Sequence, residues 1–285
     1  AWVNISFAFE HFKYNLSTKH ILFKNPYWAT YDREGRNVSS YTERECLVNL
    51  VEGTFFDLAI PEVHEHTIKV ISDIVTRYDV SGIHYDFVRY PYSGFNSYYN
   101  KFLKDFGYNH IARIRFIEKY GIDPIETPYR AKSIVRELWK NFRREQLNNI
   151  VKRSYEAIKK INRRVVVSAA VIPNAPAAIN VYFQDWLYWV KQRWLDVVYS
   201  MNYEKENKTY LRNVKFALDA KKYVPVFMGV YVEKERSPEF ILSQIKISYD
   251  NGFNGFCYFS YDLGKKQIEM VNKFLIEKKP LFAVR

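Results

Sequence analysis

Short apolar stretches alternate with amphipathic stretches along most of this chain. Six of the apolar stretches are rich in β-branched and aromatic residues and are nearly continuous in apolar character. That pattern is typical of strands that are covered on both faces. The six predicted strands are residues 2–9, 82–89, 165–172, 195–203, 224–232 and 253–261.

The segments between these strands carry apolar residues at helical spacing. Just before residues 62–78, for example, Pro61 stands in a position suited to a first helical turn, and the apolar residues that follow it at this spacing are Val63, Ile68, Ile71, Ile74 and Val75. The other predicted helices are residues 136–161, 184–192, 210–221, 238–251 and 266–277. Strand and helix therefore alternate through the last two thirds of the chain, which is the pattern of a parallel α/β fold.

Two parallel architectures fit this alternation, an open dinucleotide-binding sheet and a (β/α)8 TIM barrel. An open sheet of that kind needs a Gly-rich turn after its first strand, and none of the 10 glycines supplies one. We therefore predict a barrel and no nucleotide cofactor, with residues 1–285 forming a single domain. Since a barrel has eight strands and the chain opens within one, at residues 1–4, we expect the first two βα units to precede Ala1. Residues 10–61 are polar and turn-rich, and we predict a long loop over the barrel mouth.

Composition adds two partner hypotheses to this picture. The chain is 18% aromatic, with 24 Tyr and 21 Phe; such rings suit sugar stacking, although any single one more often belongs to the core. The net charge is +12, and residues 130–164 hold twelve Lys and Arg against three Glu. A basic stretch of this size could bind nucleic acid, an anionic polysaccharide or a membrane surface. The favoured interpretation is a solvated outer helix, because no nucleic-acid-binding motif accompanies the charge.

The two cysteines, Cys46 and Cys257, show no metal-binding spacing and cannot form a framework of several disulfides. Cys257 lies in an apolar run, so we predict a buried free thiol. No run of 18 apolar residues occurs, so we expect no membrane-spanning segment. We also recognise no signal peptide in the sequence.

Ionisable residues gather at the end of the second predicted strand. His84, Asp86 and Arg89 lie there, followed by Tyr90, and barrel enzymes carry their catalytic groups at the ends of strands. Period-two alternation places His84 and Asp86 on the same side. An apolar strand seldom ends in several ionisable residues without a functional reason, because each buried charge needs a partner. We therefore predict that Asp86 is catalytic. The alternative is that Asp86 and Arg89 only pair with each other to anchor the loop.

Two further carboxylates stand at the ends of later predicted strands and could act together with Asp86. Glu204 follows directly after Asn202 and Tyr203, and Asp262 follows the last predicted strand. Both are predicted catalytic partners of Asp86, although Glu204 also begins a charged run that would suit a solvated loop. Polar residues at the strand ends are predicted to bind substrate; they are Asn4, His84, Arg89, Tyr90, Asn174, Asn202 and Tyr203.

Two carboxylates across a cleft are the usual apparatus for cleaving a glycosidic bond, one as acid and the other as nucleophile or base. A serine hydrolase is disfavoured, because no Gly-x-Ser-x-Gly elbow occurs. No metal site is expected, since His64 and His66 are two residues apart on a predicted helix and so diverge. Three hypotheses follow: a glycoside hydrolase, a carbohydrate-binding barrel without catalysis, and a protein that binds an anionic polymer through residues 130–164.

Over nearly its whole length the chain resembles the glycosyl hydrolase-like 10 family, whose members are polysaccharide-active (β/α)8 barrels mainly from bacteria. The most specific match is Tyr-Asp-Val-Ser-Gly-Ile-His-Tyr-Asp-Phe-Val-Arg-Tyr-Pro at residues 78–91. Weaker matches are residues 1–4, 57–63, 142–144 (an arginine pair opening a helix), 200–203 and 259–262. The resemblance implies that the strands here are numbers three to eight. It also implies a polysaccharide or oligosaccharide substrate and an extracellular or cell-envelope setting. Ser81 and Phe87 depart from the family, since many members carry acidic residues at these two positions.

Overall fold

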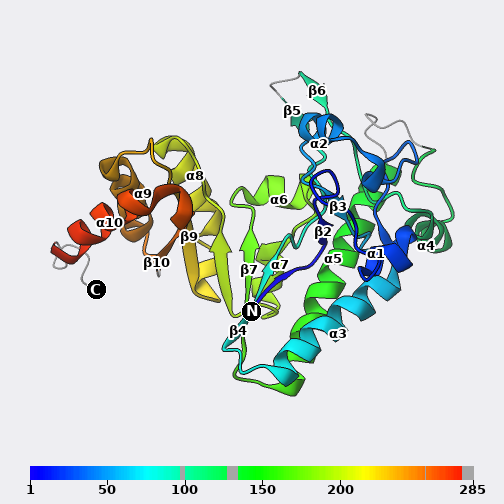
Figure 1. Cartoon of the computed structure of the whole chain (residues 1–285), viewed down its shortest axis with the longest axis horizontal. Coiled ribbons are helices and arrows are strands. Elements are labelled where there is room, and N and C mark those ends of the chain that lie inside the picture. Colours follow the sequence, from blue (N-terminus) through cyan, green and yellow to red (C-terminus); the bar gives the residue numbers. More distant parts are fainter. Residues whose placement is uncertain (97–99, 127–133, 254, 278–285) are drawn as a thin grey trace. The chain divides into compact units, whose positions relative to one another are not determined.

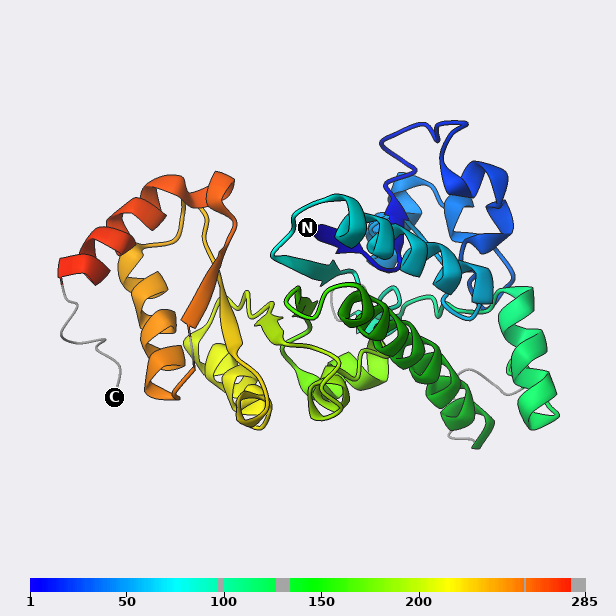
Figure 2. The same cartoon turned by 90° about the horizontal axis from the view of Figure 1, so that it is seen from below.

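The computed structural model of the protein describes residues 1–96, 100–126, 134–253 and 255–277. The chain divides into two compact units. The first unit comprises Ala1–Val166 and Pro176–Asp185, and the second comprises Val167–Ala175 and Trp186–Arg285. Figures 1 and 2 show the elements of both units.

In the first unit, two strands lie side by side in parallel, and two further pairs are antiparallel. The parallel strands are β1 (Trp2–Asn4) and β4 (Gly82–Asp86). The antiparallel pairs are β2 (Phe7–Phe9) with β3 (Thr54–Phe55), and β5 (Phe95–Asn96) with β6 (Lys101–Phe102). The single strand predicted over residues 2–9 is thus two strands with different partners.

Residues 10–61 were predicted to be a long loop, and that prediction was wrong. The segment contains α1 (Ile21–Lys24), η1 (Pro26–Trp28), η2 (Val38–Ser40) and α2 (Glu43–Asn49) as well as β3. A reciprocal capping box between Thr42 and Glu45 starts α2. Buried apolar side chains hold the segment in place; they include Leu22, Trp28, Val38 and Cys46.

The longer helices of the first unit follow the predicted periodicity. They are α3 (Pro61–Arg77), α4 (His110–Tyr120), α5 (Ile134–Ile161) and the short α6 (Ala175–Val181). Pro61 opens α3, and every fourth residue from Val63 onward is buried (Val63, Thr67, Ile71 and Val75). Helix α3 packs along α5, as both views show (Figures 1 and 2). The family resemblance placed residues 142–144 at the opening of a helix, whereas Arg143 lies in the middle of α5.

The second unit is a run of βα units. Its parallel strands lie in the order β7 (Val166–Val171), β8 (Val197–Ser200), β9 (Val226–Tyr231) and β10 (Gly255–Phe259). Its helices are α7 (Trp186–Lys191), α8 (Asn207–Ala217), η3 (Ala220–Lys222), α9 (Pro238–Asp250) and α10 (Tyr261–Glu277). A helix follows each of β8, β9 and β10, which confirms the predicted alternation of strand and helix.

Side chains of β10 alternate between its two faces, and this overturns one prediction. The Tyr258 hydroxyl donates to Asn272 on α10 at 3.0 Å, so that face lies toward the helix. Cys257 and Phe259 occupy the other face. Cys257 is exposed, contrary to the buried thiol predicted, whereas Cys46 is buried. The apolar run correctly indicated a strand, but it did not reveal which face of that strand is covered.

Of the helices that the structure describes, none combines the length and hydropathy that crossing a bilayer requires.

Candidate functional site

The strand pair β1–β4 presents one polar face. The register aligns Trp2 with His84 and Asn4 with Asp86, so these four side chains point to the same side. Between them, Val3 and Tyr85 point to the opposite side and are buried. The strand ends therefore bring together three of the residues singled out in the sequence, namely Asn4, His84 and Asp86.

Asp86 is the last residue of β4, and its neighbourhood is firmly held. Its carboxylate Oδ1 accepts a hydrogen bond from the backbone N–H of Phe87 at 2.7 Å, and its carbonyl accepts one from Ile5 N at 2.9 Å. Phe87 has a positive φ of 45° and stacks on Phe7, with ring centroids 4.5 Å apart. A positive φ is costly for an aromatic residue, so the surrounding contacts must stabilise this turn. The chain thus leaves the strand immediately after Asp86.

Ser6 ties this turn back to the segment that follows β1. Its N–H donates to Phe87 O at 3.2 Å, and its hydroxyl contacts both Phe87 O and Arg89 O. Residues 5 and 6 therefore bind three backbone carbonyls at the end of β4 and in the turn that follows, those of Asp86, Phe87 and Arg89. The position of Asp86 depends on this backbone attachment.

His84 lies one pleat before Asp86, with its ring 4.7 Å from the ring of Trp2. Burial lowers the pKa of His84 from 6.5, and the Asp86 carboxylate only partly opposes that effect. A lowered pKa leaves this imidazole largely neutral near pH 7, where it can accept or donate a hydrogen bond without carrying charge.

Arg89 pairs with Glu52 and not with Asp86 in the part of the chain described. Its Nη2 lies 2.5 Å from Glu52 Oε1, and its guanidinium stands 5.0 to 5.6 Å from the ring centroids of Phe55, Phe87 and Tyr182. The anchoring pair of Asp86 and Arg89 considered from the sequence does not form. Glu52 was missed because it lies some 37 positions away, beside β3.

Tyr90 was predicted to bind substrate and is instead buried, with only 2% of its surface exposed. Its ring meets Phe183 edge-on at 5.5 Å, and burial raises the pKa of its hydroxyl well above 10. The structure places it in the core of the first unit.

In the second unit, Asn202 and Glu204 belong to one hydrogen-bond network. The Asn213 amide donates to Asn202 Oδ1 and to Glu204 Oε1, both at 2.9 Å. Asn202 is fully buried and donates to Tyr210 O at 3.1 Å. The Glu204 carbonyl accepts from Arg236 and from Gln244, each at 3.0 Å. Asn202 is thus engaged in holding the loop after β8, and it supports the position of the Glu204 carboxylate.

The remaining predicted residues of this unit lie at other strand ends. Tyr203 stacks on Phe259, with centroids 4.7 Å apart and planes 14° from parallel. Asn174 is half-buried just before α6. Asp262 was expected directly after a strand, but β10 ends at Phe259 and Asp262 lies exposed in the first turn of α10. An acidic residue there also stabilises the helix dipole.

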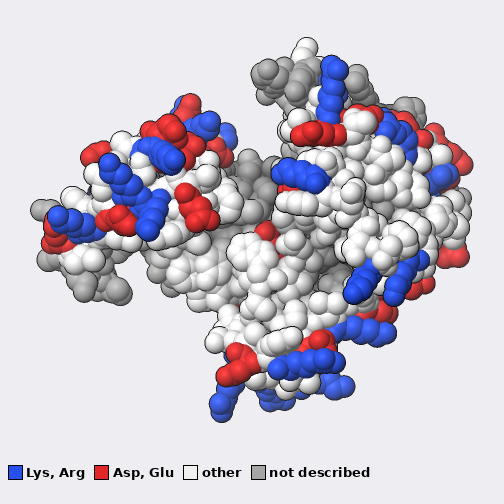
Figure 3. Space-filling model, viewed as in Figure 1, with Lys and Arg blue, Asp and Glu red and all other residues white. Residues whose placement is uncertain are grey.

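The basic stretch 130–164 is largely accounted for by α5, although residues 130–133 lie outside the described residues. Arg143 is buried and pairs with Asp105 at 2.6 Å, Arg153 pairs with Glu65, and Lys140 pairs with Glu137. On the face seen in Figure 3, Lys and Arg side chains are interspersed with Asp and Glu. The pairs made by Arg153 and Lys140 reach solvent, as on a solvated outer helix, whereas the pair of Arg143 with Asp105 is buried.

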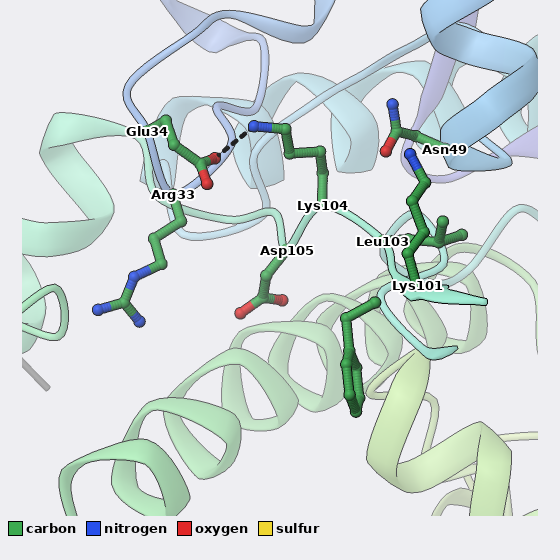
Figure 4. A pocket seen from close by; sticks show the side chains of 8 residues that line it. Arg33, Glu34, Asn49, Lys101, Leu103, Lys104 and Asp105 are labelled. Atoms are coloured by element: carbon green, nitrogen blue, oxygen red, sulfur yellow. Dashed lines mark ion pairs between the residues drawn. The ribbon is translucent and has the colours of Figure 1, made fainter. Parts of the chain in front are cut away.

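A cavity of about 200 Å³ lies in the first unit, lined among others by Arg33, Glu34, Asn49, Lys101, Lys104 and Asp105 (Figure 4). Lys104 pairs with Glu34 at 3.0 Å, and Asp105 pairs with Arg143, so both carboxylates of this cavity are engaged. None of the site residues predicted from the sequence lines it.

Over residues 1–96, 100–126, 134–253 and 255–277, no three His, Cys, Asp or Glu side chains form a group able to hold a metal ion. His64 and His66 diverge as their spacing predicted. His64 Nε2 bonds to Leu58 O at 2.7 Å, and the His66 ring lies 5.6 Å from that of Trp28.

Comparison with known proteins supplies a family and a fold. A model of the glycosyl hydrolase-like 10 family matches residues 1–237. No curated protein matches the chain in sequence.

Among solved structures, α-L-fucosidase isoenzyme 2 from Paenibacillus thiaminolyticus is similar, with a TM-score of 0.59 and 13% identity over 99% of this chain. The chain spans only 38% of that protein. The catalytic domain of β-amylase from Paenibacillus polymyxa has a TM-score of 0.58 and 11% identity, over 95% of this chain and 82% of that one. A β-galactosidase from Bacillus circulans sp. alkalophilus has a TM-score of 0.57 and 14% identity, over 84% and 38% respectively. With the six parallel strands, these similarities confirm the predicted α/β fold of the TIM-barrel class.

Proposed function

The chain belongs to the glycosyl hydrolase-like 10 family, and we propose that it is a glycoside hydrolase acting on a polysaccharide or cell-wall glycan. The observation that carries this proposal is the placement of Asp86. Its carboxylate stands at the carboxyl end of β4, beside Asn4 and on the face opposite the buried Tyr85. In barrel enzymes that end of a strand is where catalytic groups lie.

The backbone around Asp86 suits a catalytic carboxylate. The Phe87 N–H donates to Oδ1 of the carboxylate, and the attachments through Ile5 and Ser6 hold the backbone that carries it. Neutral His84 and Asn4 flank it, and both can hydrogen-bond a sugar hydroxyl. In the proposed reaction, Asp86 acts as nucleophile or as base toward water while a second carboxylate protonates the leaving oxygen.

Glu204 and Asp262 are the proposed candidates for that second carboxylate. Glu204 is held by Asn213 with one oxygen, which leaves the other oxygen available, and the loop that carries it is bound by Arg236 and Gln244. Asp262 is exposed on a helix turn with fewer constraints. Because a catalytic acid must be held in place to transfer a proton efficiently, we favour Glu204.

The test is hydrolysis of a panel of polysaccharides and cell-wall glycans by the wild-type chain and by Asp86→Asn, Glu204→Gln and Asp262→Asn. We expect kcat to fall by a factor on the order of 10² to 10⁴ in Asp86→Asn, as for loss of an acid–base group. Of the other two variants, the one that falls comparably identifies the partner of Asp86. Turnover by Asp86→Asn at the wild-type rate would remove the proposed role of this residue.

One set of contacts favours a second candidate function, a carbohydrate-binding barrel without catalysis. Tyr203 follows β8 and stacks on Phe259, so this strand end offers an aromatic surface to a sugar whether or not Glu204 transfers a proton. This candidate predicts saccharide binding that survives in Asp86→Asn, with no hydrolysis of any glycan in the panel by the wild-type chain.

A further inference from the structure

Three aromatic side chains meet at the carboxyl ends of three neighbouring parallel strands in the second unit. They are Tyr203 after β8, Tyr231 at the end of β9 and Phe259 at the end of β10, and together they form what we term the strand-end aromatic cluster. Tyr203 and Phe259 are stacked, whereas Tyr231 is tilted, with its ring centroid 6.2 Å from Tyr203 and 6.5 Å from Phe259. The parallel register that aligns Phe259 with Tyr231 brings these rings to the same level.

A glycine in β9 makes room for this arrangement. A Cβ on Gly229 would lie 2.8 Å from Cε1 of Tyr203 and 2.5 Å from Ser200 O, both closer than atoms normally approach. Any other residue at this position would therefore displace the Tyr203 ring or part strands β8 and β9. The absence of a side chain at Gly229 is what lets Tyr203 lie flat over the strand ends.

Core packing does not account for the cluster. Phe259 leaves 43% of its surface exposed although one of its faces is stacked on Tyr203. It occupies the face of β10 opposite the one that Tyr258 turns toward α10. A single exposed aromatic ring is common on protein surfaces, but this one stands level with two further rings at neighbouring strand ends and so belongs to a larger aromatic surface.

The groups around the cluster are charged. The Arg236 guanidinium lies 4.9 Å from the centroid of the Tyr231 ring and pairs with Glu233 at 3.7 Å. Glu204 follows Tyr203 directly in the chain. A pyranose ring has an apolar C–H face and a rim of hydroxyl groups, which suit an aromatic surface bordered by carboxylates and a guanidinium. The two carboxylates disfavour nucleic acid, whose phosphates they would repel.

We propose that the strand-end aromatic cluster is a stacking subsite for a pyranose ring whose substituents are equatorial, as in β-1,4-linked glucose or N-acetylglucosamine. Such rings present a flat C–H face to an aromatic side chain. The subsite rests on the proposed function, because it names the part of the site that holds the sugar and the class of sugar held. Phe259 supplies the exposed stacking surface, and Tyr203 and Tyr231 support it.

The test is a titration of cellohexaose and of chitohexaose into the Asp86→Asn chain, which holds turnover low during the measurement. The same titrations follow with Phe259→Ala or Phe259→Leu added. Leucine keeps an apolar side chain of similar size but has no flat face. The matched control adds Phe274→Ala, an aromatic residue on α10 that is 38% exposed and lies away from the strand ends. Thermal unfolding of each variant verifies that it is folded.

We expect at least one hexasaccharide to bind, and its affinity to fall roughly tenfold with Phe259→Ala, somewhat less with Phe259→Leu, and not at all with Phe274→Ala. Equal affinity in the parent and in both Phe259 variants would overturn the subsite, as would failure of both sugars to bind the parent.

Measuring hydrolysis of the glycan panel separately tells the two proposals apart. Binding that depends on Phe259 without any hydrolysis by the wild-type chain would leave the subsite standing and refute the hydrolase. Hydrolysis whose KM is unchanged by Phe259→Leu would do the reverse.

Discussion

Replacing Glu52 with Gln tests how the protein stabilises a buried cation next to its candidate catalytic strand. Arg89 is 7% exposed, and Glu52 approaches its Nη2 at 2.5 Å from a position where 42% of the carboxylate side chain remains exposed. Glutamine keeps the shape and one oxygen acceptor but removes the negative charge. The guanidinium would then keep a hydrogen bond to Tyr90 O at 3.2 Å and its three aromatic neighbours.

The expected loss follows from how far each partner is buried. Breaking a fully buried ion pair costs about 3 to 5 kcal/mol, whereas an exposed pair contributes at most about 1 kcal/mol. Water reaches the Glu52 side of this pair, and the aromatic rings around Arg89 retain part of its stabilisation. We therefore expect Glu52→Gln to lower the free energy of unfolding by about 1 to 3 kcal/mol.

The assay is urea unfolding of the wild-type chain and of the variant, with Glu65→Gln as the matched control. Glu65 pairs with Arg153 at the same 2.5 Å, but its side chain is 55% exposed and that of Arg153 is 42% exposed. We expect the control to lose much less, because water screens an exposed pair. Equal losses in the two variants would show that burial of Arg89 does not strengthen its pair with Glu52, and the reasoning would fail.

Three further predictions follow from groups elsewhere in the chain. Burial lowers the pKa of His64 from 6.5 to about 4, so the stability that its neutral form contributes is complete above pH 6.5 and is lost as the pH falls toward 4, by about 3 kcal/mol in all. His64→Gln should flatten the pH dependence of the urea midpoint across this window, and an unchanged slope would contradict the prediction. With a thiol reagent at pH 8, exposed Cys257 should react first. Buried Cys46 should react far more slowly, because burial raises the pKa of its thiol to about 11. Cys257→Ser should remove the fast phase of the reaction, and a fast phase that remains in this variant would refute the assignment. Gly229→Ala should cost about 1 to 3 kcal/mol of stability and weaken hexasaccharide binding, because its Cβ would displace the Tyr203 ring. Urea unfolding measures the first effect and titration the second, and a neutral result in both would show that Gly229 does not determine the position of the ring.

The six parallel strands could be predicted from the sequence because each lies in a short, nearly continuous apolar run, and one of these runs ends in ionisable residues. That pattern located Asp86 and, through period-two alternation, placed His84 on the same face, as the structure has it. The alignment of Asn4 with Asp86 depends on which strands pair, which no single strand reveals. That residues 1–285 form one barrel domain stays a prediction.

The partner of Arg89 could not be predicted, because ion pairs between distant residues leave no local signal. Glu52 lies in a segment that lacks helical periodicity, since α2 has only seven residues and β3 has two. Elements so short are stabilised by caps and by tertiary contacts such as those of Cys46, and neither shows as an apolar pattern. The strand-end aromatic cluster did leave a signal, since Tyr203, Tyr231 and Phe259 each stand within two residues of the end of a predicted strand.

The attachment of residues 5 and 6 to the turn after β4 also bears on how new specificities could arise. Ile5 N bonds to Asp86 O at 2.9 Å and the Ser6 hydroxyl to Arg89 O at 2.5 Å, so the candidate catalytic carboxylate takes its position from the strand beside it. The segment between the two strands contributes Glu52 to this corner, and its residues 10–49 make no hydrogen bond to Asp86. The largely exposed stretch of this segment at residues 13–19 could therefore be lengthened, shortened or exchanged with little effect on the position of the carboxylate, whereas buried side chains such as Trp28 and Val38 hold the rest of the segment in place. Selection for a different glycan could therefore change this stretch without moving the candidate catalytic carboxylate.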